Sequence, residues 1–547
     1  MTNPLLSQPA AQVTPKYTPE QLAFISELSS GAGSIILEAV AGSGKTTTLV
    51  AAANALPTSV SGIALAFNAK IKKELESRLP KNIKCMTLNG LGHGAWQAHT
   101  GTRLKVETNK LNKVVSETMA YHHLEKDTEG WFIVRDLVAK AKSHGMEPAS
   151  YDSAIWIVED TIPEWVSLAS RYGIFLELSP KPKPTATESE RAQYEENNKK
   201  RIKQYVTLAR EALNLSCQQA FDSIIDFDDQ LYMTYCFSAP LTQYPLVLVD
   251  EAQDLSALQH ELLNGCVAPN GRLIAVGDPH QAIYGFRGAD VESMSNLRDR
   301  FSMKTLPLSY SFRCGSTIIE AAQAYVPHIK APETAPLGEI IHLDEWTAQD
   351  LANEIPCVVL CRSVAPLIRT AFRLIRAGVS CAVAGRDIGK GLVKYTKNFG
   401  SPTAYEDLLL VINEWADSEI MVAEANKDNA KAFMLNDVRE TLICIAAFGT
   451  CNTVAQLTAT IEELFKAETG SVILSTIHKS KGLEWDTVFL LDSYRCPASY
   501  AREPWQLVQE DNLMYIAITR AKKKLIYINS DNFINPTDDK GEQHDDE

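Results

Sequence analysis

The sequence predicts an α/β protein in which parallel sheets are interrupted by mainly helical insertions. Residues 35–50, IILEAVAGSGKTTTLV, combine an apolar strand, a glycine-rich turn and a helix. Residues 244–251, YPLVLVDE, form a continuous apolar run that ends in two acids, which is typical of a central parallel strand buried on both faces. Residues 357–385 indicate a further strand, helix and strand. Together these patterns favour two sheet domains.

Composition bounds the class of protein. The chain has 547 residues, enough for about three or four domains, with 45% hydrophobic and 22% charged residues. No apolar run approaches the roughly 20 residues of a membrane-spanning helix, and the N-terminus lacks a secretion signal. We therefore expect a cytoplasmic protein with no membrane partner, while a nuclear location stays open. The net charge of −14 disfavours passive coating of duplex but not a narrow basic track.

The 11 cysteines contain no CxxC pair. Cys357 and Cys361 lie closest, on an apolar stretch that indicates a buried strand. Reduced core thiols are therefore favoured over a metal site.

The segment after the first strand predicts a phosphate-binding loop. Gly42 and Gly44 allow the backbone N–H groups to point at phosphate oxygens, and the following helix N-terminus favours anions. We expect Lys45 to reach the β and γ phosphates and Thr46 to hold Mg²⁺. Ala39 stands where the general pattern has its first glycine. The predicted nucleotide-binding residues of this segment are Ala39, Val40, Ala41, Gly42, Ser43, Gly44, Lys45, Thr46 and Thr47.

A second acidic cluster completes a predicted nucleotide hydrolase. Asp250 and Glu251 follow the apolar strand at its carboxyl end, where parallel sheets bind ligands. We expect Asp250 to hold Mg²⁺ through water and Glu251 to orient and deprotonate the attacking water. A solvated acidic turn is the alternative, and the buried strand directly before it argues against that. ATP and Mg²⁺ are the expected cofactors.

The segment 272–290, RLIAVGDPHQAIYGFRGAD, resembles motif III of the UvrD/Rep branch of superfamily 1 helicases. Other segments are similar to the remaining motifs, in the order of the family. They are YTPEQ (17–21, Q motif), ALAFNAKIKKEL (64–75, Ia), TLNGLG (87–92, Ib), IDFDDQL (225–231), LPLSYSFRCGSTI (306–318, IV), STIHKSKGLEWDTVFL (475–490, V) and NLMYIAITRAKKKL (512–525, VI). The resemblance therefore covers nearly the whole chain.

Within that branch the chain looks most like the F-box DNA helicase subgroup and its phage and bacterial relatives. GDPHQ, FRGA, KGLEWDTV and YIAITRAKKKL carry this likeness. No F-box-like segment precedes the Q motif, so a ubiquitin-ligase role is not implied. The compact length favours a bacterial or phage source.

The resemblance implies roles at the ATP site. Gln21 would read the adenine and Phe312 would stack on it. Arg313 and Arg520 would reach the γ phosphate from the second domain, where such arginines stabilise transition-state charge. Gln281 would sense the γ phosphate. Glu484 would reach the ribose or the closed-cleft network. Without the resemblance, surface salt bridges would explain the arginines equally well.

The resemblance also implies a track for single-stranded DNA, in which aromatic faces stack on bases and polar groups contact phosphates. The candidates are Phe67, Asn68, Thr87, Asn89, Tyr284, Phe286, Arg287 and His478. Asn89 replaces the usual histidine of motif Ib, and Phe286 stands where the family often has tryptophan. Core packing is the alternative for the aromatic residues.

Lys45 and Asp250 lie much farther apart than one sheet crossing requires, which predicts a helical insertion. We expect a first RecA-like domain at 1–100 and 217–303 with its insertion at 101–216. A second RecA-like domain is expected at 304–392 and 466–530, with a smaller insertion at 393–465 and a disordered acidic tail at 531–547. The basic residues of 199–203 indicate either a solvated helix face or a DNA-facing rim.

The function expected from the resemblance is that of an ATP-dependent DNA helicase. It would move 3′→5′ on single-stranded DNA, bind junctions with duplex, and act in replication, repair or recombination with proteins of those pathways. A translocase that mainly strips bound proteins is the alternative. A P-loop kinase and a binding module with a dead ATP site are disfavoured. RNA as the track stays open, because stacking and phosphate contacts do not discriminate sugars.

Overall fold

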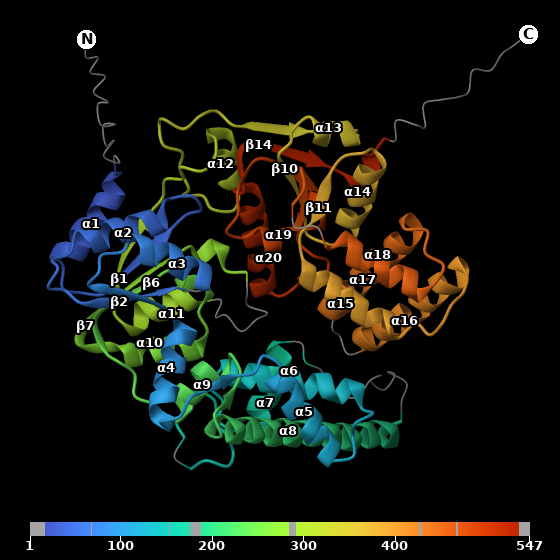
Figure 1. Cartoon of the computed structure of the whole chain (residues 1–547), viewed down its shortest axis with the longest axis horizontal. Helices are drawn as coiled ribbons and strands as arrows, with labels where there is room; N and C mark the ends of the chain where they lie inside the picture. The colour runs from blue at the N-terminus through green and yellow to red at the C-terminus, as the bar shows by residue number, and fades with distance from the viewer. Residues whose placement is uncertain are drawn as a thin grey trace, which may run out of the picture.

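The computed structural model describes residues 17–66, 68–152, 154–172, 174, 176, 187–283, 292–425, 429–466 and 469–534. In this part of the chain the strands form two six-stranded parallel sheets and one short two-stranded pair. Helices cover the sheets, and two groups of helices extend away from them (Figure 1). The α/β fold class with two RecA-like domains and helical insertions is confirmed.

The first sheet has the strand order β3-β2-β6-β7-β1-β8. Its interior strands β1 and β6 correspond to the two apolar runs that the sequence predicts as strands. The strands are β1 (Ile35–Ala39), β2 (Gly62–Ala66), β3 (Ile83–Thr87), β6 (Tyr244–Val249), β7 (Val267–Gly277) and β8 (Lys304–Leu308). The helices next to them in sequence are α1 (Pro19–Ser30), α2 (Lys45–Asn54), α3 (Ala69–Arg78), α10 (Ala257–Cys266) and α11 (Ser293–Arg300).

The second sheet has the order β11-β12-β10-β13-β14-β9. Its strands are β9 (Glu339–His342), β10 (Cys357–Cys361), β11 (Cys381–Val383), β12 (Val472–Thr476), β13 (Trp485–Leu491) and β14 (Ala521–Ile528). Its helices are α12 (Ser316–Ala322), α13 (Ala348–Ala352), α14 (Ala365–Arg376), α19 (Ile477–Ser480) and α20 (Pro504–Ile518). Cys357 and Cys361 are fully buried free thiols of β10, as the sequence favours.

The first insertion grows out of the first sheet along α4 (Leu88–Thr100) and returns through α9 (Asp229–Cys236) (Figure 1). Its elements are β4 (Lys105–Val106), α5 (Lys110–Tyr121), α6 (Thr128–Ser143), α7 (Ile162–Arg171), α8 (Glu188–Phe221) and β5 (Ile224–Ile225). Thr187 and Glu190 form a capping box that starts the 34-residue helix α8. One hydrophobic core joins the insertion to the sheet, since it contains both Leu65 of β2 and Trp165 of α7.

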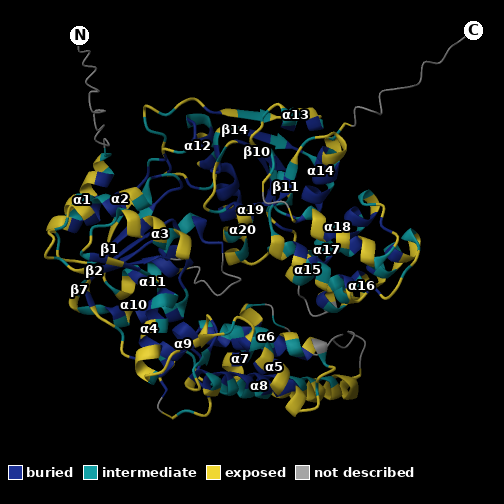
Figure 2. Ribbon diagram, viewed as in Figure 1, coloured by how far each residue is buried: buried dark blue, intermediate teal, exposed yellow. Residues whose placement is uncertain are grey.

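The second insertion comprises four helices, α15 (Arg386–Thr396), α16 (Tyr405–Ala425), α17 (Asn429–Phe448) and α18 (Val454–Leu464). It also shares its core with a sheet, because Leu408 and Leu442 lie in one cluster with Val359 of β10. The buried residues follow the strands and the inner helix faces, and the exposed ones lie on the outer faces of the insertions (Figure 2).

Four expected boundaries differ from the structure. The boundary between residues 392 and 393 falls inside α15, which runs from Arg386 to Thr396. Residues 304–308 were expected to open the second domain, but β8 pairs in parallel with β1, so the first sheet ends at Leu308. The boundary at residue 217 falls inside α8, which runs unbroken to Phe221. The tail was expected from residue 531, yet Phe533 packs edge-on against Trp346 at 4.8 Å between ring centroids. Apolar residues that the acidic composition obscured extend the fold to Ile534, and residues 535–547 lie outside the described residues.

Candidate ATP site and nucleic-acid interface

The phosphate-binding loop lies between β1 and α2 and is held in a left-handed conformation at two glycines. Gly42 has φ +72° and Gly44 has φ +77°. A Cβ atom on Gly42 would lie 2.5 Å from Cβ of Arg313, so the close approach of the second domain also requires glycine. Gly44 is the N-cap of α2 and brings no side-chain cap, which leaves first-turn N–H groups for an anion.

Gln21 lies directly beside this loop. It forms a capping box with Thr18 at the start of α1. Its Nε2 donates to the carbonyl of Ser43 at 3.3 Å and to Oγ1 of Thr48 at 3.1 Å. The structure therefore brings Gln21 to the predicted site, where its amide is bonded to the loop and to α2.

The acid pair faces the loop from the carboxyl end of β6. Oγ1 of Thr46 donates to Oδ2 of Asp250 at 3.0 Å. Gln253 donates to Oε2 of Glu251 at 2.6 Å, and Glu251 adopts a left-handed backbone with φ +56°. A hydroxyl beside a buried carboxylate is a set of hard oxygen donors, which suits Mg²⁺. The residues present therefore fit the expected ion.

The two acids titrate differently. Burial, reinforced by the charge of Glu251, raises the pKa of Asp250 to about 6, although Lys45 opposes the shift. Burial also acts to raise the pKa of Glu251, but the charges of Lys45 and Lys481 and the Gln253 hydrogen bond outweigh it, so that pKa is lowered. Glu251 is consequently ionised at neutral pH, as a base for water requires.

The segment after β8 brings the second domain to the loop. The backbone N–H of Phe312 donates to the carbonyl of Gly42 at 2.9 Å, and the Phe312 ring is half exposed. Upstream, Ser309 donates through its N–H (2.7 Å) and its hydroxyl (2.6 Å) to the carboxylate of Glu20 on α1. The linker between the domains is thus bonded to the nucleotide-binding elements of the first domain.

The two predicted arginines are both held by groups of the second domain. Nε of Arg313 donates to Glu484 at 2.7 Å. Arg520 is fully buried and donates to the carbonyls of Ile516 at 3.0 Å and Leu483 at 2.9 Å. Burial, together with the charge of Arg313, lowers the pKa of Arg520 to about 9. Both guanidinium groups are therefore fixed in place before they meet a phosphate.

Contacts between motifs cross from one domain to the other. Nζ of Lys481 donates to both carboxylate oxygens of Asp254 at 2.8 Å and to the carbonyl of Gln281 at 2.6 Å. The phenol of Tyr515 accepts from the N–H of Ala41 at 2.7 Å and donates to Asp278 at 3.4 Å. Of these residues, sequence reasoning predicted Ala41 and Gln281. It missed Lys481, Tyr515, Asp278 and Asp254, although the first three lie inside motifs V, VI and III.

Gln281 lies where the sequence places it, at the junction of the domains. It is buried, and its Nε2 donates to Oδ2 of Asp278 at 2.6 Å. Since Asp278 also accepts from Tyr515, the side chain and the carbonyl of Gln281 both join cross-domain chains of hydrogen bonds. This arrangement links motif III to motifs V and VI.

Several predicted DNA-contacting residues have local structural bonds. Asn68 caps α3 by accepting from the N–H of Ile71 at 2.9 Å, and Thr87 caps α4 by accepting from Gly90 at 3.0 Å. His478 lies partly exposed on α19. Four predicted residues lie outside the described residues, namely Phe67, Tyr284, Phe286 and Arg287.

Asn89 has a partner that the sequence did not indicate. Its Nδ2 donates to the carbonyl of Phe227 at 2.7 Å. The Phe227 side chain is 55% exposed, although Asp226 and Asp229 of the same turn are buried. An aromatic residue flanked by acids in IDFDDQL was the available signal. This exposed ring lies beside motif Ib.

Two absences concern the described residues alone. None of their helices is long and apolar enough to cross a membrane. They also contain no group of three histidine, cysteine, aspartate or glutamate side chains placed to hold a metal ion.

Comparisons with known proteins agree with this geometry. The model of the UvrD/REP helicase N-terminal domain matches residues 18–302, and that of the UvrD-like helicase C-terminal domain matches residues 418–532. F-box DNA helicase protein 1 of Schizosaccharomyces pombe is 25% identical over 523 residues, which cover 90% of this chain and 55% of that protein. F-box DNA helicase 1 of Gallus gallus is 24% identical over 541 residues, or 93% of this chain and 49% of that protein.

A shorter match reaches DNA helicase II of Escherichia coli, which is 36% identical over 81 residues, 15% of this chain and 11% of that protein. The chain spans about half the length of the two F-box helicases that it matches. The resemblance inferred from the motifs is confirmed. Because the N-terminal family model alone covers more than half of the chain, the protein belongs to the UvrD/Rep family of superfamily 1 helicases.

Proposed function

We propose that this chain is an ATP-dependent DNA helicase that moves on single-stranded DNA and unwinds duplex at junctions. The observation that carries the proposal is the divided ATP site. The loop and acid pair belong to the first sheet, whereas Phe312, Arg313 and Arg520 belong to the second domain, and hydrogen bonds join the two. A site divided in this way can couple hydrolysis to relative movement of two domains.

The residues of the first domain divide the chemistry between them. Lys45 and the N-terminus of α2 bind the β and γ phosphates. Thr46 and Asp250 hold Mg²⁺, which when bound neutralises charge that develops on the phosphate oxygens. Glu251, with its lowered pKa, orients the attacking water and takes its proton.

The residues of the second domain report on the nucleotide. Arg313 and Arg520 contact the γ phosphate when the cleft is closed and withdraw when it opens, while Phe312 stacks on the adenine that Gln21 reads. Glu484 orients Arg313, to which it is bonded at 2.7 Å, and reaches the ribose or the closed-cleft network. Gln281 senses the γ phosphate, and its bonds to Asp278 and Lys481 carry that signal between the domains.

The DNA track follows the carboxyl ends of both sheets. Asn68, Thr87 and His478 contribute polar contacts to the backbone of the strand. We add Phe227 to the predicted stacking residues, because its ring is exposed and its backbone is bonded to Asn89 of motif Ib. Stacking of a base on such a ring contributes about 1–3 kcal/mol. Four residues outside the described part of the chain complete the proposed track, namely Phe67, Tyr284, Phe286 and Arg287.

The finer assignments are part of the same proposal. They are 3′→5′ movement, a role in replication, repair or recombination with proteins of those pathways, and action in the cytoplasm. The division into two RecA-like domains with one helical insertion each also belongs here, with the sheet boundaries given above.

The first test is the ATPase rate with no nucleic acid, single-stranded DNA, duplex DNA or single-stranded RNA at one low salt concentration. The proposal expects a large rise with single-stranded DNA. Partial duplexes with a 3′ or a 5′ tail then test polarity, and strand separation from the 3′ tail alone is expected. Efficient removal of protein from coated single strands without unwinding would favour the stripping translocase instead. No rise with any polymer would refute the proposal.

A further inference from the structure

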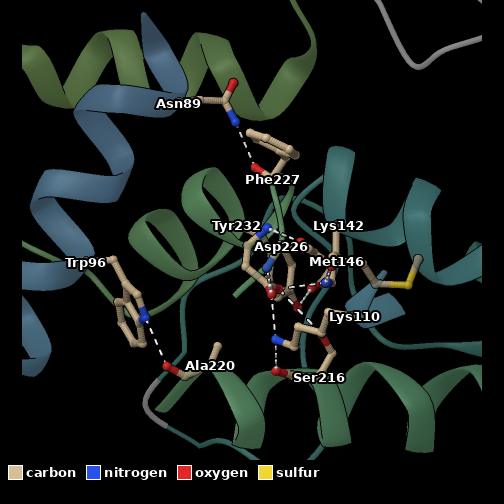
Figure 3. A network of polar contacts seen from close by, with 11 residues as sticks. Asn89, Trp96, Lys110, Lys142, Met146, Ser216, Ala220, Asp226, Phe227 and Tyr232 are labelled. Carbon is tan, nitrogen blue, oxygen red and sulfur yellow. Dashed lines mark hydrogen bonds and ion pairs between the residues drawn. The ribbon is translucent and has the colours of Figure 1, made fainter. Parts of the chain in front are cut away.

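Two lysines of the first insertion, Lys110 and Lys142, lie in one network of polar contacts with Asp226 (Figure 3), and Asp229 completes this network. Lys110 of α5, Lys142 of α6 and Asp229 of α9 are fully buried, and Asp226 nearly so. Lys142 donates to Asp226 at 2.9 Å and pairs with Asp229 at 2.6 Å. Lys110 donates to Asp229 at 2.5 Å and to the carbonyl of Ser216 on α8 at 2.7 Å. The four charges thus join α5, α6, α8 and α9.

The two aspartates also close a turn on each other. The N–H of Asp226 donates to Oδ2 of Asp229 at 2.9 Å, and the N–H of Asp229 donates to Oδ1 of Asp226 at 2.8 Å. Each carboxylate oxygen therefore has a hydrogen-bond donor or an ammonium group opposite it. The turn has two residues at its tip, Phe227 and Asp228, and both are exposed.

Asp229 and Lys142 carry their charges at neutral pH. Burial acts to raise the pKa of Asp229, but the charges of Lys142 and Lys110 outweigh it and lower that pKa to about 2. Burial acts to lower the pKa of Lys142, and the two aspartates raise it above the usual range instead. A buried ion pair contributes little stability compared with apolar side chains of the same volume. Its directional bonds, in contrast, define one geometry for the groups that they join.

The geometry that is defined here is that of the Phe227 turn. From the buried side, the lysines of the insertion hold both ends of the turn. From the exposed side, Asn89 of α4 donates to the carbonyl at its tip (Figure 3). The ring of Phe227 is consequently presented at the junction between the insertion and motif Ib, with little freedom in its backbone.

We propose that Lys110 and Lys142 are positioning residues for the DNA track, which hold the Phe227 turn in the orientation that binding of a single strand requires. This inference rests on the proposed function. It assigns the first insertion a direct part in strand binding, because two of its helices supply the ammonium groups. The insertion, the turn and motif Ib then form one body that grips the strand.

The test measures the single-stranded DNA concentration that gives half-maximal ATPase stimulation, using the full chain. The main variant is Lys142→Met with Asp226→Asn, which removes one charge of each sign and keeps an acceptor oxygen for the N–H of Asp229. We expect that concentration to rise about tenfold, within the range for loss of one stacked base. Lys113→Met is the matched control, because Lys113 is an exposed lysine of α5 paired with Glu107 at 2.6 Å. It should stay within about twofold of the unmodified protein.

A double-mutant cycle with Phe227→Ala distinguishes positioning from a general structural role. If the lysine acts through the ring, the combined variant binds DNA no worse than Phe227→Ala alone. If the combined variant showed the product of the two separate binding defects, the inference would be overturned. An unchanged half-maximal DNA concentration in the Lys142→Met/Asp226→Asn variant would overturn it as well. If the main variant does not fold, Asp226→Asn alone serves as the test. In that variant the half-maximal DNA concentration should rise roughly threefold. Absent stimulation of the unmodified protein would instead refute the proposed function.

Discussion

The cross-domain ion pair of Lys481 permits a quantitative prediction for Lys481→Met. The Lys481 ammonium makes three hydrogen bonds to the first domain, two of them to Asp254. The exposed fractions of these side chains are only 9% and 3%, so solvent screens the pair weakly. Removing one partner of such a pair costs about 3–5 kcal/mol, because the other charge stays buried.

The cost falls on the closed arrangement of the two domains, since opening the cleft returns Asp254 to water. Burial already raises the pKa of Asp254 to about 6 while Lys481 opposes that shift, so protonation relieves part of the penalty in the variant. A net penalty of about 3 kcal/mol would reduce the equilibrium constant for closure roughly 100-fold. Because hydrolysis requires closure in the proposed cycle, kcat/KM for ATP should fall by a similar factor.

The assay is steady-state ATP hydrolysis at saturating single-stranded DNA, with two comparison variants. Lys523→Met removes an exposed lysine of the same domain, paired with Asp486 at 2.7 Å, and should change kcat/KM less than about twofold. The double variant Lys481→Met/Asp254→Asn removes the orphaned charge and should recover part of the loss. If kcat/KM for ATP fell less than threefold in Lys481→Met, the reasoning would be refuted, because the ion pair would then contribute little to closure.

Three further outcomes are expected. Lys45→Ala should abolish ATP turnover while circular dichroism stays native, and turnover at the original rate would contradict the phosphate-site assignment. Gly42→Ala should lower kcat/KM by at least about tenfold, since its Cβ would meet Arg313 at 2.5 Å and left-handed backbone disfavours alanine; tight nucleotide binding with normal turnover would argue against the close approach. Asp250→Asn should end turnover and raise the Tm of the nucleotide-free protein by a few degrees at pH 8. The folded pKa of Asp250, about 6, lies above its unfolded value, so ionisation destabilises the fold above pH 6 and not below pH 4. The gain in Tm should therefore vanish at pH 4. An equal gain at pH 4 and pH 8 would contradict the upward shift of the Asp250 pKa in the folded protein.

Much of the ATP site follows from local sequence, because strand, loop and helix are contiguous. Gly42, Gly44 and Thr46 are arranged by the backbone of one segment, and Asp250 follows from the rule that parallel strands share a ligand-binding edge. The order of the motifs then predicted which segments form the second domain. These inferences need no knowledge of how distant segments pack.

The residues that were missed depend on packing between distant segments. Lys110 and Lys142 look like ordinary helix-surface lysines, and only their burial beside Asp229 distinguishes them. Tyr515 likewise acquires its role from meeting Ala41 across the cleft. The boundary at residue 304 failed for a similar reason, since pairing of β8 with β1 is a long-range contact that composition does not encode.

The place where β8 ends has a mechanical consequence. The chain leaves the first sheet at Leu308 and enters the second domain through Ser309–Phe312, and this connection is bonded to Glu20 and to Gly42. The segment that links the two domains is therefore the same stretch of backbone that contacts the nucleotide-binding elements. Any rotation that separates the sheets must twist the peptide groups that touch the phosphate loop. Nucleotide sensing and domain rotation therefore depend on the same residues. Lengthening this connection would loosen the link between the domains and would also weaken the coupling of the nucleotide site to their movement.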